Sequence, residues 1–205
     1  MNKQQGFTLV EIAIVMVIIG LLLGGVLKGQ EIVKNAKIKN LENDFSGITA
    51  AIYSYQDRYR ALPGDDLDTK TKARFGATIA GGDNDGNIEG VALAPKTNDE
   101  SGMFWTHLRS AGLIDGEFDD DSLPGNAFSG LTGVSSENVL NITGGRTYIG
   151  FSKIPNDIAS ILESRSDNEN PTTGSIRASK DANNTADDAT YTGDDDLIRN
   201  VFFIL

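Results

Sequence analysis

The sequence contains no cysteine and one histidine, His107, in 205 residues. A chain without cysteine has no disulfide and no thiol nucleophile, and a single histidine leaves zinc short of its usual ligands. The sequence also lacks a glycine-rich phosphate loop and a nucleophile elbow. These absences argue against an enzyme and against a zinc protein. We expect His107 to lie on the surface of a helix.

Basic residues are scarce: 18 lysines and arginines stand against 29 aspartates and glutamates, a formal net charge of -11. Residues 1–40 hold five of the basic and two of the acidic side chains, which leaves 13 basic against 27 acidic in residues 41–205. A domain with that balance repels nucleic acid phosphates and suits cation binding or plain solubility. We therefore expect no nucleic acid partner.

Proline is absent before Pro63, and charge is nearly absent from Phe7 to Leu27, where Glu11 is the one ionisable side chain. As a helix rising ~1.5 Å per residue, this run is about 31 Å long, enough to cross the hydrocarbon core of a bilayer. A soluble helix of that length is rarely apolar on every face. The run predicts a membrane-spanning helix over residues 7–27.

The residues around the start of this run are unlike a secretory signal peptide. The leader Met1–Gly6 is short and polar, the apolar run is too long for a signal peptide, and no Ala-x-Ala site follows it. The start of the chain combines a short basic leader, Gly6, Phe7, the run Thr-Leu-Val-Glu that ends at Glu11, and the long apolar helix that follows. In these features it resembles the N-terminus of the type IV pilin and type II secretion pseudopilin superfamily.

The resemblance implies that prepilin peptidase cuts between Gly6 and Phe7 and methylates the amine of Phe7. The apolar helix then stays on the mature protein. The resemblance also implies a partner for Glu11, whose carboxylate is costly within a membrane: the amine of Phe7 on a neighbouring subunit. The alternative, that Glu11 stays hydrated near the lipid head groups without a specific partner, remains open.

The implied fold is α+β and pilin-like, with a long N-terminal helix packed on an antiparallel β-sheet. We expect residues 1–6 to form the prepilin leader peptide, 7–27 the transmembrane and assembly helix, 28–60 its continuation docking on the head, and 61–205 the C-terminal globular head domain. Lysines after the span outnumber the single lysine of the leader, which alone would place the head in the cytoplasm. The resemblance places it outside, and we follow the resemblance because long domains translocate largely regardless of charge.

The function implied is that of a structural subunit of a type IV pilus or related filament. Expected partners are copies of the chain and homologous pilin subunits, prepilin peptidase and the inner-membrane assembly platform. The subunit would start as a single-pass inner-membrane protein and end in a surface pilus or a periplasmic pseudopilus. Open alternatives are a type II secretion pseudopilin, a tip-located minor pilin that acts as a binding or adhesion module, and an anchored calcium-binding protein that never assembles.

Beyond the apolar run, one apolar stripe at alternating spacings of three and four residues predicts that the helix continues to about Arg60. The stripe consists of Ile38, Leu41, Phe45, Ile48, Ile52, Tyr55 and Tyr59. Pro63 with Gly64 then ends the helix. We interpret the stripe as the face that docks on the head domain, with coiled-coil association as the alternative.

An acidic stretch between Gly81 and Gly90 is the one candidate metal site. Side chains that carry oxygen alternate along this stretch, and a glycine allows a sharp turn, so several oxygens can converge on one cation. The pattern predicts a site for calcium as a cofactor. The candidate ligands are Asp83, Asp85, Asn87 and Glu89. The match to an EF-hand loop is partial, and an ordinary polar turn is the alternative.

The remaining pattern predicts short elements of the head. We expect a helix from about Glu100 to Ala111, a hairpin that pairs residues 139–142 with 146–151, a helix over 157–164, and a final strand over 197–205. Residues 63–95 are expected to form loops.

Overall fold

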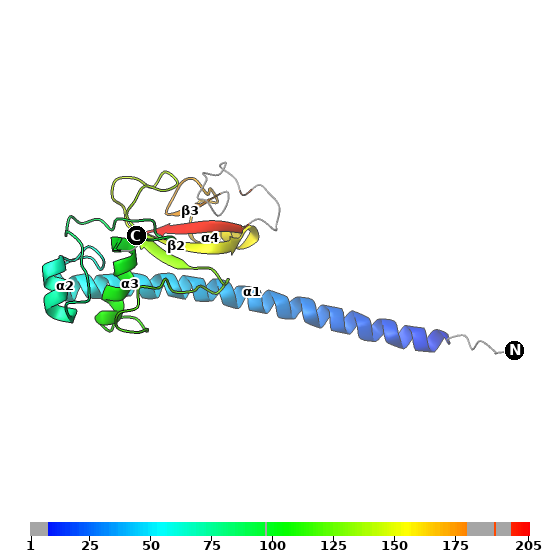
Figure 1. The fold of residues 1–205 in the computed structure, drawn as a ribbon. Helices are drawn as coiled ribbons and strands as arrows, with labels where there is room; N and C mark the ends of the chain where they lie inside the picture. Colours follow the sequence, from blue (N-terminus) through cyan, green and yellow to red (C-terminus); the bar gives the residue numbers. More distant parts are fainter. Residues whose placement is uncertain (1–7, 97, 180–190, 192–197) are drawn as a thin grey trace. The chain divides into compact units, whose positions relative to one another are not determined.

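The computed structural model describes residues 8–96, 98–179, 191 and 198–205. Its first element is one helix of 51 residues, α1, Leu9–Tyr59 (Figure 1). The chain divides into two compact units, Met1–Lys39 and Asn40–Leu205, so α1 contributes to both. Each unit is described by itself below.

Within the first unit, α1 presents its apolar side chains to the surroundings. Every residue from Thr8 to Val33 is exposed. By length and composition, α1 is long and apolar enough to cross a membrane. A helix that is apolar all round needs lipid or other apolar chains around it, which agrees with the membrane segment predicted from the sequence.

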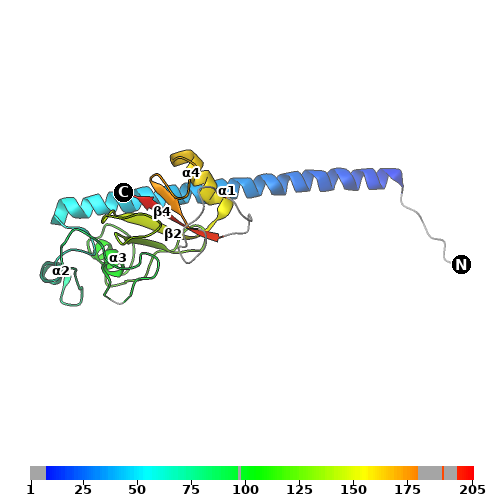
Figure 2. The same ribbon diagram turned by 90° about the horizontal axis from the view of Figure 1, so that it is seen from above.

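The second unit is built on one antiparallel sheet of four strands in the order β1-β2-β4-β3. The strands are β1 (Thr132–Ser135), β2 (Tyr148–Pro155), β3 (Ile176–Ala178) and β4 (Ile198–Ile204). The C-terminal strand β4 therefore lies between β2 and β3, as Figure 2 shows. Its residues 199–204 are buried, which means that both faces of this strand are covered, since successive side chains point to opposite faces. The long helix and the antiparallel sheet confirm the expected α+β, pilin-like fold.

The part of α1 that belongs to the second unit is amphipathic and packs on the head. Leu41, Ile48, Ile52 and Tyr55 are buried, whereas polar residues of the same turns are mostly exposed. The Phe45 ring lies 4.9 Å from that of Phe203 on β4, measured between centroids. The apolar stripe is therefore a docking face within this unit.

Three further helices complete the head: α2 (Asp68–Phe75), α3 (Glu100–Ser110) and α4 (Asn156–Ser166). The last two agree with the predicted helices. The prediction of loops throughout residues 63–95 was wrong for α2. This eight-residue helix buries only Thr71, so its sequence carries almost no apolar periodicity from which a helix could be read.

The predicted hairpin of residues 139–142 with 146–151 was also wrong. Val139 and Ile142 form an isolated bridge with each other, and β2 pairs instead with β1 and β4. Strand β1 reads Thr-Gly-Val-Ser, a weak strand signal. Its Gly133 leaves room for the backbone carbonyl of Ala92, which a Cβ would strike. Close packing, rather than β propensity, places this strand.

Helix α4 lies against β2, β3 and β4 and buries a carboxylic acid there. Glu163 is fully buried, and that burial raises its pKa to about 8, against the opposing charge of Arg177. A folded-state pKa above the unfolded value favours folding while the group is protonated. The stabilisation is complete below the unfolded pKa of about 4.5 and is lost as the pH rises through about 8.

We therefore expect Glu163→Gln to be more stable than the parent chain at pH 9, by about 1 kcal/mol or more, and to lose this advantage near pH 5. The measurement is thermal unfolding of both full-length chains in detergent across this pH range. Asp157→Asn, on the same helix, is the matched control and should keep the parental pH profile. Parallel profiles for Glu163→Gln and the parent would contradict the assignment.

Candidate functional site

The start of α1 is a capping box formed by Thr8 and Glu11. One Glu11 carboxylate oxygen accepts hydrogen bonds from the Thr8 backbone N–H at 2.8 Å and from the Thr8 hydroxyl at 2.7 Å. The Glu11 N–H in turn donates to the Thr8 hydroxyl at 3.3 Å. Such reciprocal bonds satisfy helix N-terminal donors that have no partner in the helix itself. Both side chains are exposed.

This contact was missed by the sequence analysis, which gave Glu11 only an intermolecular partner. The signal was present, since a threonine followed three residues later by a glutamate before an apolar run is the capping-box pattern. Gly6 and Phe7, the predicted processing residues, lie outside the described residues.

Three of the four predicted calcium ligands come together in the second unit. Carboxylate oxygens of Asp83, Asp85 and Glu89 lie within 4.8 Å of one another, and all three residues are exposed. The Asn87 side-chain amide donates to both carboxylate oxygens of Asp85 at 3.0 Å. Gly86 has a φ of 95°, which allows the sharp turn that the sequence indicated.

Two buried carboxylates that the sequence analysis did not assign to this site complete it. Carboxylate oxygens of Asp65 and Glu100 lie within 4.8 Å of one of Asp83. Glu100 accepts hydrogen bonds from the backbone N–H groups of Asp83, at 3.1 Å, and Glu89, at 3.2 Å. Asp65 accepts hydrogen bonds from two further N–H groups of the loop, those of Asp85 and Gly86, each at 3.0 Å.

The acidic loop is thus held from inside by carboxylates that come from elsewhere in the chain. Asp65 precedes α2, and Glu100 opens α3. A Cβ at Gly82 would strike the Glu100 carboxylate, which explains the glycine there. Because these residues are far apart in the sequence, no local spacing could have joined them.

Crowding of these carboxylates changes their acidity. Burial, and after it a hydrogen bond shared with the Glu89 side chain, raises the pKa of Glu100 well above its usual range. Burial likewise raises the pKa of Asp65, against three backbone N–H groups that lower it. A raised pKa means that a carboxylate keeps its proton because no positive charge lies close to it. A hard divalent cation bound among these oxygens would supply that positive charge.

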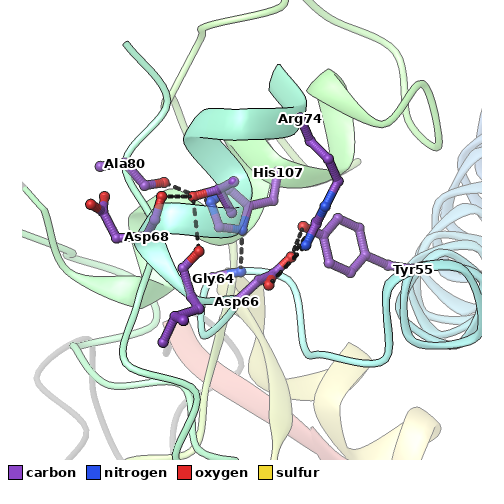
Figure 3. A network of polar contacts seen from close by, with 9 residues as sticks. Tyr55, Gly64, Asp66, Asp68, Arg74, Ala80 and His107 are labelled. Carbon is purple, nitrogen blue, oxygen red and sulfur yellow. Dashed lines mark hydrogen bonds and ion pairs between the residues drawn. The ribbon is translucent and has the colours of Figure 1, made fainter. Parts of the chain in front are cut away.

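Next to this loop, a buried ion pair fastens α2 to α1 (Figure 3). Asp66 is fully buried and accepts two hydrogen bonds from the Arg74 guanidinium. The Tyr55 hydroxyl donates to the same carboxylate at 3.0 Å. Burial, together with the Asp66 charge, raises the pKa of Tyr55, so its hydroxyl keeps the proton that it donates. Bidentate pairing of this kind satisfies a carboxylate that would otherwise be buried without a counter-charge.

The prediction of a surface position for His107 was wrong. His107 is fully buried on α3, where its Nδ1 accepts a hydrogen bond from the Gly64 N–H at 2.9 Å. Its Nε2 lies 2.8 Å from the Ala80 carbonyl oxygen and, with Nδ1 accepting, donates to it (Figure 3). The ring is stacked on that of Tyr55 with centroids 6.1 Å apart. Both nitrogens therefore serve to hold the 64–80 segment, and the ring is neutral.

Comparison with known proteins adds one match. Residues 1–27 match the family model described as the prokaryotic N-terminal methylation motif. No curated protein matches the chain significantly.

The buried histidine predicts a pH-dependent stability. Burial lowers the pKa of His107, so protonation is harder in the folded than in the unfolded chain. The stabilisation is complete above the unfolded pKa of about 6.5 and is lost as the pH falls toward the lowered folded value. We expect His107→Gln to be less stable by about 1–3 kcal/mol at pH 7.5, because the Gly64 N–H and Ala80 carbonyl lose well-placed partners.

The free energy of unfolding of the parent chain should fall below pH 6.5 as His107 becomes protonated, whereas His107→Gln has no such group. The difference in stability between the parent chain and the variant should therefore shrink as the pH falls. Chemical denaturation of the full-length chains in detergent at a series of pH values measures this. If the difference between them were constant from pH 7.5 to 5, the neutral assignment of His107 would be wrong.

Proposed function

We propose that this chain, which carries the N-terminal methylation motif that is the hallmark of type IV pilins and pseudopilins, is a structural subunit that polymerises through α1 into a type IV pilus or related filament. The observation that carries the proposal is the motif at residues 1–27, which leads directly into a helix exposed from Thr8 to Val33. An exposed apolar helix of this length favours burial in lipid before assembly and among neighbouring helices after it.

In this proposal, prepilin peptidase cleaves between Gly6 and Phe7 and methylates the amine of Phe7. The subunit waits in the inner membrane with its head outside the cytoplasm, and the inner-membrane assembly platform adds it to other pilin subunits. The product is a surface pilus or a periplasmic pseudopilus. The role is structural rather than enzymatic.

The capping box gives Glu11 hydrogen-bond partners while the subunit lies in the membrane before assembly. An unpaired carboxylate within a bilayer costs at least about 2.5–3.5 kcal/mol. The Thr8 N–H and hydroxyl already bind one oxygen of Glu11. The carboxylate then has further lone pairs for the amine of Phe7 on a neighbour, whose charge complements it. In this proposal, Thr8 stabilises the Glu11 carboxylate in the membrane before assembly, and Glu11 aligns subunits in the filament.

We expect Glu11→Gln to reduce sheared filaments at least tenfold while the chain still inserts into the membrane, because the amide cannot form the ion pair. The measurement is the amount of subunit in sheared filaments against that in the membrane fraction. Glu31→Gln, which removes an exposed α1 carboxylate paired with Lys28 at 2.8 Å, is the matched control and should assemble normally. Normal assembly of Glu11→Gln would refute the role of Glu11.

A second proposal concerns the acidic loop: Asp83, Asp85, Asn87 and Glu89 bind calcium, with help from the buried carboxylates of Asp65 and Glu100. Supporting it are two groups of three carboxylates that share Asp83, with oxygens within 4.8 Å of one another in each group, and the raised pKa of Glu100. Calcium takes six to eight oxygen ligands, and bound calcium would take the place of the proton that Glu100 retains.

We expect titration calorimetry of the full-length chain in detergent to show one calcium site whose affinity rises with pH between 6 and 8, as protons are displaced. Asp83→Asn should weaken binding at least tenfold, since Asp83 belongs to both carboxylate groups. Asp119→Asn, an exposed acid in another loop, should change little. Absence of heat at millimolar calcium would end the proposal.

A further inference from the structure

A groove of about 370 Å³ lies in the second unit, between the α1 turn that carries Asp44 and Ile48 and the segment after α3. Its lining includes Trp105, Ile114 and Asp115. The groove thus combines apolar walls with two carboxylates, the combination that accepts the aliphatic stem and ammonium group of a lysine.

One observation sets this groove apart from an ordinary surface depression. A Cβ added to Gly47, which lines the groove on α1, would meet no atom within 4 Å. The helix therefore leaves open space there, which an incoming side chain can fill.

Two acidic residues, Asp44 and Asp115, and one basic residue, Arg109, line the groove. The Arg109 guanidinium is already engaged, since it donates to the carbonyl oxygens of Asp120, at 2.6 Å, and Ser122, at 2.8 Å. An occupant of this groove is therefore expected to be cationic.

The chain itself supplies a cationic segment of the right kind. Residues 28–39 of α1 contain four lysines and one glutamate, whereas residues 41–205 have an excess of 14 acidic side chains. Lys39, the last residue of the first unit, is exposed. Charge complementarity thus favours contact between this segment of one copy and the groove of another.

The axial register of the proposed filament brings these groups to the same height. In a bundle of parallel copies, placing the amine of Phe7 level with Glu11 of a neighbour needs an offset of four residues, about 6 Å along the helix. The same offset places Lys39 level with Asn43 of that neighbour, one residue before Asp44. One displacement therefore serves both ion pairs.

We infer that Lys39 of one copy docks in the groove of a neighbouring copy, where its ammonium pairs with Asp44 and Asp115 and its stem lies along Ile48. The inference rests on the proposed polymerisation through α1. It names a second contact between copies, outside the membrane-spanning residues, that fixes how heads stack on neighbouring helices.

Crosslinking tests this contact cleanly, because the chain has no cysteine of its own. Two differently tagged full-length chains, one Lys39→Cys and the other Asp44→Cys, are co-expressed, and sheared filaments are treated with a short bis-maleimide. A heterodimer carrying both tags is expected. Lys39→Cys with Asp57→Cys is the control pair, and it should not crosslink because the offset leaves about 21 Å between the two levels.

Charge reversal provides a second measurement. Lys39→Glu and Asp44→Lys should each reduce sheared filaments several-fold, and the double variant should recover most of the loss. Gly47→Leu should fold as the parent does, because its side chain enters open space, yet assemble poorly because it fills the groove.

The outcomes separate this inference from the proposed function. Filaments that form without the Lys39–Asp44 crosslink, together with a double variant no better than the single ones, would overturn the inference and leave the filament proposal intact. A parent chain that forms no filament with its assembly machinery would overturn both.

Discussion

The exposure of an apolar helix is the constraint on which the rest of this molecule depends. From Thr8 to Val33 every residue of α1 is exposed, and apolar surface left in water costs roughly 25 cal/mol per Å². The first unit therefore needs lipid or other copies to cover it. Within the second unit, the same helix becomes amphipathic and buries Leu41, Ile52 and Tyr55. One helix thus carries an exposed apolar surface in the first unit and forms part of a folded core in the second.

The head shows how a loop-rich domain without disulfides is held together. Buried Asp65 and Glu100 bind backbone N–H groups of the acidic loop, and Asp66 joins Arg74 to Tyr55. These bonds act beside the buried apolar side chains of the same segment, Ile79, Ile88 and Ala92. The consequence is a concentration of negative charge, which suits the loop to a cation.

Features that were predicted correctly have local signals, and those that were missed depend on distant partners. The α1 stripe and the final strand follow from periodicity and apolar composition. His107 lies between Thr106 and Leu108 on α3, and nothing near it in sequence shows that Gly64 and Ala80 will enclose its ring. Asp65 and Glu100 likewise gain their roles from loops that pack between them.

By itself, the sequence determined the N-terminal methylation motif, the long apolar run and the docking stripe, because each is written in consecutive or helically spaced residues whose hydrophobicity acts without a partner. The tertiary structure alone decided the placement of β1 beside β2, the burial of His107 and the joining of Asp65 and Glu100 to the acidic loop. These depend on close packing and hydrogen bonds between segments far apart along the chain, which carry no periodic signal.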